Sequence, residues 1–315
     1  MRDFLPTLVS PGFLLLYAFL GCVLYVHFRG KERLRFERQL TEHSGLLSPL
    51  NCIFYAFSSV PKDPILDPAD FPELAPLKEN WETIRDEAVA LMGEGKIAYD
   101  KGSSDLAFLA FQKRGWKRFY LRWYHDYFPS AVESCPKTVE LTRSIPGLNA
   151  AAFTMLPPGG VLGKHRDPLA SSLRYHLALV TPTQPGCKLW VDGQEHEWQA
   201  GQDLVFDETY VHWAENPTDE NRIVFFADFT RPIGNRVVRA FNQFLIDHVY
   251  RVTRSRNDAG ESAGMLNRIT PIFVGGKKFF RGIKERSNRR LYYTVKYSLF
   301  GTLLWFVVVR PMVMG

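Results

Sequence analysis

The sequence predicts a mainly β domain, a sandwich or jelly roll with flanking helices, that lies between two apolar chain ends. From Ala151 onward, short β-rich runs alternate with turn signals about every eight to twelve residues, a spacing typical of such folds. Two long apolar stretches lie near the ends of the 315-residue chain. A hydrophobic content of 46% supplies a buried core, and a mean hydropathy of -0.16 excludes a polytopic membrane protein.

The first apolar stretch covers residues 8–28 and contains no charged residue. As a helix it would be roughly 31 Å long, at about 1.5 Å per residue, which matches the hydrocarbon thickness of a bilayer. A cleaved signal peptide is the alternative, and the sequence around Cys22 resembles a lipoprotein signal. However, the apolar run continues past Cys22, where a mature lipoprotein would become polar. We therefore expect residues 1–30 to form an N-terminal membrane anchor.

The segment that follows the anchor is predicted to contain a packing helix and then a strand. Between residues 71 and 92, apolar residues recur in steps of four and three, which predicts one helix with a single buried face. These residues are Leu77, Trp81, Ile84, Ala88 and Leu91. In residues 115–124, aromatic and basic residues interleave. This pattern indicates a β-strand with one solvent-facing side rather than a surface that stacks nucleic-acid bases.

The β-rich region is divided into strands by proline and glycine turn signals. Asp192-Gly193 predicts a two-residue hairpin turn between two of these strands. The expected strands are residues 173–181, 188–191, 195–198, 203–207 and 222–229. After Arg231-Pro232 the pattern changes, and residues 237–250 are predicted to be helical.

The C-terminal part of the chain is basic and ends in a second apolar segment. Residues 251–296 contain twelve Lys or Arg and three acidic residues, although the whole chain carries a net charge of only +6. Residues 297–309 are apolar or small but short for a span, so a transmembrane helix and an interfacial helix both remain open. We expect a basic helical juxtamembrane region over residues 236–290 and a C-terminal membrane segment over residues 291–315.

The charges beside the apolar segments predict the orientation of the chain. Five basic residues follow the first segment within ten positions, whereas only Arg2 precedes it. By the positive-inside rule, everything between the two segments lies in the cytoplasm. The basic stretch then faces an anionic leaflet, a partner that we favour over nucleic acid. The four cysteines form no Cys-x-x-Cys pair, which also fits a reducing compartment.

His165 and Asp167 form a His-x-Asp motif at the start of the β-rich region. A motif of this kind arises by chance about once in a chain of this composition, so it has no weight alone. On a strand, however, residues i and i+2 project to the same side, so both can bind one metal ion. His212 supplies a third ligand. Two histidines and one carboxylate are the ligand set of non-haem Fe(II) oxygenases, although a zinc hydrolase could use the same residues.

Cationic side chains near this motif indicate an anionic substrate. Arg222, ten residues after His212, could hold a carboxylate through two parallel hydrogen bonds. Arg174 and His176 share one face of the predicted strand 173–181 and add two further donors, so we expect a dicarboxylic acid. Each residue alone has a simpler structural explanation, such as a turn cap, a core histidine or a surface ion pair. The catalytic interpretation therefore depends on their combination.

Several stretches of the chain are similar to a known enzyme family. They are residues 165–168, 172–177 and 206–212, together with Arg222. In them the chain resembles the aspartyl/asparaginyl β-hydroxylase family of Fe(II)- and 2-oxoglutarate-dependent dioxygenases, and within it the bacterial lipid A hydroxylases. The wider similarity covers over half of the chain. Asp167 favours this lipid-modifying branch, because the animal peptide hydroxylases of the family lack the acidic ligand.

The resemblance implies a double-stranded β-helix of the cupin-like kind over residues 50–235. It also implies that the site binds Fe(II), the cosubstrate 2-oxoglutarate and O₂. Arg222, helped by the hydroxyl of Thr154, would hold the distal carboxylate of 2-oxoglutarate. The implied iron ligands are His165, Asp167 and His212, and the residues implied to lie near 2-oxoglutarate or substrate are Arg222, Thr154, Arg174 and His176.

By the same resemblance, the reaction is hydroxylation of C2 of a secondary acyl chain of lipid A at the cytoplasmic face of the bacterial inner membrane. Terminal anchors fit a substrate that stays in the bilayer. Two alternatives remain open. One is a membrane-tethered hydroxylase of Asp or Asn side chains in proteins, and the other is a metal-free jelly-roll binding module anchored at the bilayer.

Overall fold

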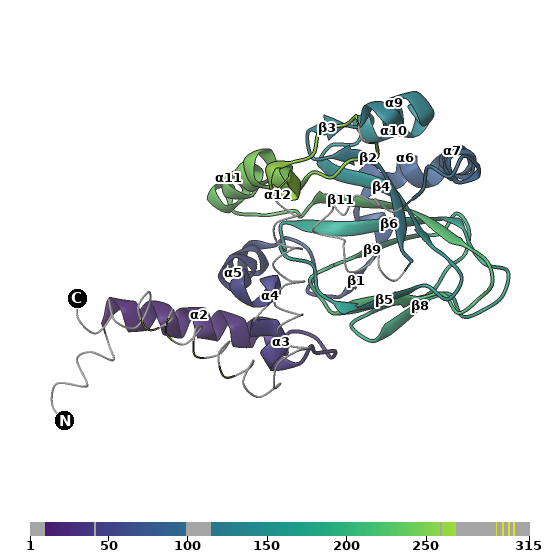
Figure 1. The fold of residues 1–315 in the computed structure, drawn as a ribbon. Coiled ribbons are helices and arrows are strands. Elements are labelled where there is room, and N and C mark those ends of the chain that lie inside the picture. The colour runs from purple at the N-terminus through teal and green to yellow at the C-terminus, as the bar shows by residue number, and fades with distance from the viewer. Residues whose placement is uncertain are drawn as a thin grey trace.

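Two antiparallel sheets packed face to face form the centre of the molecule (Figure 1). The structure is a computed structural model that describes residues 10–40, 42–98, 115–258 and 260–268, with residues 294, 298, 302 and 305. The larger sheet has the strand order β1-β9-β6-β11-β4-β2-β3, and the smaller sheet has the order β5-β10-β7-β8. Apart from residues 294, 298, 302 and 305, the predicted C-terminal membrane segment lies outside the described residues, and so does most of the basic stretch.

The chain alternates between the two sheets from β4 to β11. Strands β4, β6, β9 and β11 belong to the larger sheet, whereas β5, β7, β8 and β10 belong to the smaller sheet. This alternation defines a double-stranded β-helix, so the predicted fold class is confirmed. The strands are β1 Ile65–Leu66, β2 Lys117–Trp123, β3 Asp126–Tyr127, β4 Leu148–Leu156, β5 Val161–His165, β6 Ser172–Val180, β7 Lys188–Val191, β8 Gln194–Glu197, β9 Asp203–Phe206, β10 His212–Glu215 and β11 Arg222–Thr230.

The five strands predicted in the β-rich region are present as β6, β7, β8, β9 and β11, with ends shifted by one residue at most. The predicted hairpin between β7 and β8 is present too, and it turns at Asp192 and Gly193 with φ of 52° and 80°. Positive φ at both positions gives the turn the twist that the paired strands require.

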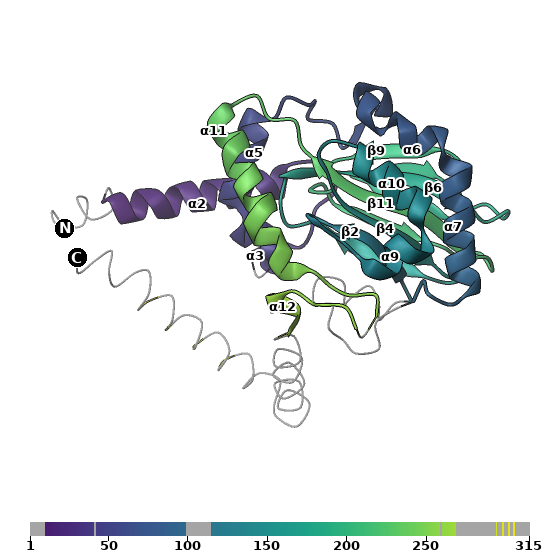
Figure 2. The ribbon, with the colours of Figure 1, turned by 90° about the horizontal axis from the view of Figure 1, so that it is seen from above.

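Four helices cover the outer face of the larger sheet, away from the smaller sheet (Figures 1 and 2). They are α6 Ala75–Glu79, α7 Trp81–Gly93, α9 Pro129–Ser134 and α10 Pro136–Ser144. The prediction of one continuous helix between residues 71 and 92 is wrong, because the helix is interrupted at Asn80, between α6 and α7. The Asn80 side chain donates to the Pro76 carbonyl at 2.8 Å and competes with the helical backbone for that acceptor. The buried face nevertheless has the predicted residues Leu77, Ile84, Ala88 and Leu91.

Strand β2 confirms the strand predicted within residues 115–124, but its expected solvent-facing side is covered. The strand lies between β4 and β3, and five of its seven residues are buried. The Arg118 guanidinium is buried against Ser255, to whose hydroxyl it donates at 2.8 Å, and the Tyr120 amide donates to Asn257 at 2.8 Å. A segment distant in sequence therefore covers the basic side of this strand.

A second group of helices lies at one end of the β-helix. Helix α2, Pro11–Phe28, is long and apolar enough to cross a membrane by length and composition, with a mean hydropathy of 1.8. Its far end extends away from the sheets (Figure 1). The other helices here are α3 Phe36–Leu40, α4 His43–Leu46, α5 Ser48–Phe57 and α11 Arg236–Phe244. Helix α11 continues into a wider turn at Leu245–Val249, which confirms the helical prediction for residues 237–250.

These helices are joined to the β-helix by a small hydrophobic cluster. Val26 of α2, Phe54 of α5 and Leu245 after α11 pack with Leu169 and Ile233. Leu169 belongs to the loop between β5 and β6. The base of the apolar helix α2 is therefore packed into the domain, whereas most of its remaining surface is exposed.

Candidate metal and cosubstrate site

One pocket between the two sheets is lined by all seven site residues that the sequence predicts. Its remaining lining is largely apolar and aromatic, including Trp116, Leu189, Phe206 and Phe226. The seven residues are Thr154 on β4, His165 at the end of β5, Asp167 in the following loop, Arg174 and His176 on β6, His212 at the start of β10 and Arg222 at the start of β11.

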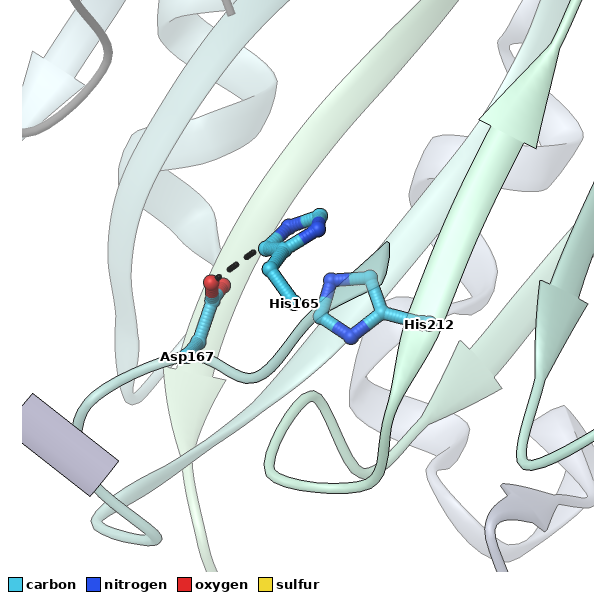
Figure 3. Close-up of side chains that lie close together, drawn as sticks. All are labelled: His165, Asp167 and His212. Carbon is cyan, nitrogen blue, oxygen red and sulfur yellow. Dashed lines mark ion pairs between the residues drawn. The ribbon is translucent and has the colours of Figure 1, made fainter. Parts of the chain in front are cut away.

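His165, Asp167 and His212 converge on one point in this pocket (Figure 3). The antiparallel pairing of β5 with β10 places His212 directly opposite His165, with ring centroids 4.1 Å apart. Nε2 of His165 lies 3.8 Å from Oδ1 of Asp167. One ligand atom from each residue lies within 4.8 Å of the others, a spacing that suits a shared metal ion.

Asp167 reaches the site from a loop, and not from a strand as the His-x-Asp motif predicts. Strand β5 ends at His165, two residues earlier. The Asp167 amide donates to the carbonyl of Glu208 at 2.9 Å, and Oδ2 accepts from Nη2 of Arg174 at 2.7 Å. These two contacts, rather than the pleat of a strand, orient the carboxylate.

Backbone carbonyls fix the orientation of both histidine rings. Nδ1 of His165 lies 2.7 Å from the Gly163 oxygen, and Nδ1 of His212 lies 3.0 Å from the Tyr210 oxygen. Because a carbonyl can only accept, each Nδ1 carries the proton and each Nε2 presents a lone pair. A metal-binding histidine is commonly held through its second nitrogen in this way.

The protonation states of these three residues also suit a metal. Burial, and next the neighbouring His212, lower the pKa of His165 to about 3, and burial lowers the pKa of His212. Burial disfavours the charged form of Asp167, but Arg174 and the two histidines outweigh it and hold its pKa below the usual range. At neutral pH the group therefore offers two neutral imidazoles and one carboxylate.

The charge of Arg174 is balanced by acidic side chains of the protein, whereas the sequence predicts that Arg174 donates to a bound dicarboxylic acid. Its guanidinium pairs with Asp167, with Glu208 and, at 2.6 Å, with Asp228. Burial raises the pKa of Glu208 and that of Asp228 above their usual values. Neither acid is among the predicted site residues, although Asp228, an acidic residue within the apolar strand β11, is a recognisable signal of a buried charge.

Among the described residues, Arg222 has no counter-charge in the pocket. Its side chain is 2% exposed, and its Nε has no hydrogen-bond partner among the residues that the structure describes. Burial lowers the pKa of this guanidinium, which indicates how costly the unpaired charge is. Its Cζ lies over the Trp198 ring, 5.5 Å from the ring centroid. Such a side chain fits a bound carboxylate.

His176 lies deep in the same pocket and is neutral. Burial lowers the pKa of this histidine well below its usual value. Both ring nitrogens are buried without a hydrogen-bond partner within the described part of the chain, and the ring packs against Trp198, Phe206 and Phe226. The neutral ring can donate one hydrogen bond to a bound ligand, but it adds no charge to the positive cluster predicted from the sequence. Thr154, on β4 beside β11, completes the polar lining.

The fold and the pocket together define a double-stranded β-helix protein with a candidate metal centre of two histidines and one carboxylate. Residues 78–232 match the family described as Aspartyl/Asparaginyl beta-hydroxylase. The chain carries a domain of this family, as the resemblance in the sequence implied.

Two curated relatives and one solved structure illustrate the similarity. The chain is 35% identical over 181 residues to an ornithine lipid ester-linked acyl 2-hydroxylase of Rhizobium tropici, covering 56% of this chain and 64% of that protein. It is 28% identical to the human aspartyl/asparaginyl beta-hydroxylase, covering 50% of this chain and 21% of that protein. The matches thus span less than two thirds of either relative. A Pseudomonas putida prolyl-4-hydroxylase structure aligns over 49% of this chain and 87% of its own, with 20% identity and a TM-score of 0.33.

Proposed function

We propose that the protein is an Fe(II)- and 2-oxoglutarate-dependent dioxygenase. The observation that carries this proposal is the presence, in one pocket, of a His-Asp-His group and of the buried Arg222 guanidinium, which has no counter-charge among the described residues. His165, Asp167 and His212 would hold the iron, and two histidines with one carboxylate are the ligand set of non-haem Fe(II) oxygenases. Arg222 would hold the far carboxylate of 2-oxoglutarate. Bound iron with 2-oxoglutarate would supply the oxygen chemistry that hydroxylates an unactivated C–H bond.

The protein's own residues would orient the reactants and exclude water. The carbonyls of Gly163 and Tyr210 hold the two imidazoles, and Arg174 holds the carboxylate of Asp167. The apolar lining described above keeps bulk water from the reacting atoms. His176 would donate a hydrogen bond to the cosubstrate or to the substrate.

For the substrate, we propose an acyl chain of a membrane lipid, hydroxylated at C2. The relative from Rhizobium tropici is named for this reaction on ornithine lipid, and helix α2 suits an enzyme whose substrate stays in a bilayer. The acidic ligand Asp167 fits the lipid-modifying branch of the family. Among membrane lipids we propose the secondary acyl chains of lipid A, at the cytoplasmic face of the bacterial inner membrane.

The proposed organisation follows from this substrate. Residues 1–30 would anchor the protein, residues 50–235 would form the dioxygenase domain, residues 236–290 would lie against the anionic membrane surface, and residues 291–315 would return to the membrane. The basic residues that follow α2 support the cytoplasmic orientation.

Mass spectrometry of the lipids from a deletion strain tests this proposal. Complementation with the wild-type gene should add one oxygen to the acyl part of lipid A, and complementation with Asp167→Ala should not. A gain of one oxygen on ornithine lipid instead would support the same reaction on a different lipid.

The family match and the human relative favour a second candidate, hydroxylation of Asp or Asn in a protein. Unchanged lipids together with a hydroxylated protein residue would replace our proposal by that one.

A further inference from the structure

Helix α11 exposes an apolar face on the outside of the domain. Val237, Phe241 and Phe244 follow one another in steps of four and three, so they share one side of the helix. Val237 is 77% exposed and Phe244 is 53% exposed. The opposite side is anchored to the protein, because Asn242 is buried and donates to the Ser171 carbonyl at 3.0 Å. The helix is therefore firmly placed, yet its apolar face is partly exposed within the described chain.

Helix α5 extends this face. Its residues Ile53 and Phe57, one turn apart, are 41% and 43% exposed. The buried ring of Phe54 stacks on Phe241 with centroids 6.3 Å apart, and the Gly234 amide before α11 donates to the Phe57 carbonyl at 3.0 Å. The two helices thus lie side by side. We call their exposed apolar residues, Ile53, Phe57, Val237, Phe241 and Phe244, the apolar platform.

The apolar platform lies at the end of the domain from which α2 emerges (Figures 1 and 2). Helix α2 packs directly on α5, where the rings of Tyr25 and Tyr55 are 6.2 Å apart. In Figure 2, α11 runs across the direction of α2. If α2 stands in a bilayer, α11 therefore lies along the bilayer surface, close to the point at which α2 enters it.

The charges around the platform match the same surface. Arg236 and Arg239 of α11 are exposed beside the apolar residues, and Arg33 and Arg35 are exposed just after α2. Phenylalanine and aliphatic side chains flanked by arginine are characteristic of helices that lie in the headgroup region of an anionic membrane. An apolar face with this composition, adjoining a helix able to span the bilayer, fits lipid rather than water.

We propose that the apolar platform of α5 and α11 is inserted in the headgroup region of the anionic leaflet that holds α2. This inference rests on the membrane attachment in the proposed function, but not on the identity of the substrate. It sets the catalytic domain against the membrane in one orientation. Asn51 of α5 also holds the loop with Asp167, since it donates to Pro168 O at 3.0 Å and accepts from Ala170 N at 2.8 Å. The membrane surface would thus lie next to the metal-site loop.

Spin labels on the full-length protein in phosphatidylglycerol-containing nanodiscs test this orientation. One label is attached per variant, at Val237→Cys or at Phe244→Cys. Both variants also contain Cys22→Ala and Cys52→Ala, which remove the two accessible cysteines, whereas Cys135 and Cys187 are buried and can stay. The matched control is Val89→Cys, at a position that is 40% exposed. It belongs to α7, and this helix lies at the opposite end of the domain from α11 (Figure 2). Accessibility of each label to O₂ and to a water-soluble nickel reagent reports its depth, whether or not the enzyme turns over.

Both platform labels should gain accessibility to O₂ and lose accessibility to nickel in nanodiscs, and the α7 label should stay accessible to nickel. Platform labels that remain as open to nickel as the control would overturn the inference. Dipolar broadening between platform labels would overturn it too, because the face would then join two copies of the protein. Either result would leave the proposed reaction intact, since the lipid mass measurement tests that separately.

Discussion

The guanidinium of Arg166 donates a hydrogen bond to the carbonyl oxygen of Arg29 at 3.1 Å. Arg166 lies between His165 and Asp167 in the sequence, whereas Arg29 directly follows the apolar helix α2. Arg29 in turn forms a buried ion pair with Asp207 at 2.7 Å. The end of α2 is therefore part of the framework that holds the candidate metal ligands, in addition to any role as an anchor.

Arg29→Ala should destabilise the protein by about 3 kcal/mol, the lower end of the range for breaking a buried ion pair. The lower end applies because Asp207 keeps its second partner, Arg231, at 2.9 Å. Thermal unfolding in detergent measures the effect. The control is Arg35→Ala, whose ion pair with Glu37 is exposed to solvent and should contribute much less to stability. Equal changes for the two variants would contradict a structural role for Arg29.

Arg222→Met should have opposite effects on ligand binding and on stability. It removes a charge that is buried without a counter-charge among the described residues, so the ligand-free protein should unfold at the same or a higher temperature. Affinity for 2-oxoglutarate should fall about 100-fold, since a buried charged contact contributes roughly 2–5 kcal/mol.

Calorimetry with Mn²⁺ in place of iron measures the affinity of Arg222→Met without turnover. Arg222→Lys is the companion variant, because it keeps the charge but cannot form two parallel hydrogen bonds with a carboxylate. It should bind 2-oxoglutarate with intermediate affinity. Wild-type affinity in Arg222→Met would show that another residue holds the acid.

The strands of the β-rich region could be predicted because their signals are local. Strands β6, β7 and β11 each consist of apolar runs bounded by proline, glycine or aspartate, and these residues act on the neighbouring backbone. Strand β10, only four residues long, was not predicted. It exists because β5 and β7 pair with it from both sides, and such partners cannot be read from the four residues themselves.

The composition of the pocket could be predicted, but its charge balance could not. The spacing of His165, Asp167 and His212 suggested a ligand group, and the structure brings the three together. Arg174, however, is balanced by Asp228, which lies opposite it only because β6 pairs with β11 in one register. Cross-strand register depends on long-range packing, so no local pattern shows which cation stays unpaired.

Arg174→Lys should weaken metal binding by about 10- to 100-fold, the usual cost of disturbing a residue that orients a metal ligand. The lysine keeps one positive charge but cannot contact Asp167, Glu208 and Asp228 together. Titration with Co²⁺, followed by its absorption spectrum, measures the affinity. The control is Arg122→Lys on β2, whose guanidinium contacts Tyr124 and Tyr127 and does not line the pocket. Unchanged Co²⁺ affinity in Arg174→Lys would refute a positioning role.

The metal-free protein should lose stability as the pH falls from about 6.5 toward about 3. The pKa of His165 is about 3 in the folded protein, against an ordinary value of 6.5, and burial is the main cause. In this window the unfolded chain binds a proton at His165 that the folded chain does not, so acid favours unfolding by about 1.4 kcal/mol per pH unit. Urea unfolding at a series of pH values gives the slope. His165→Asn should reduce the slope of unfolding free energy against pH by that amount, whereas His248→Asn, at an exposed position, should not. An unchanged slope in His165→Asn would refute the prediction.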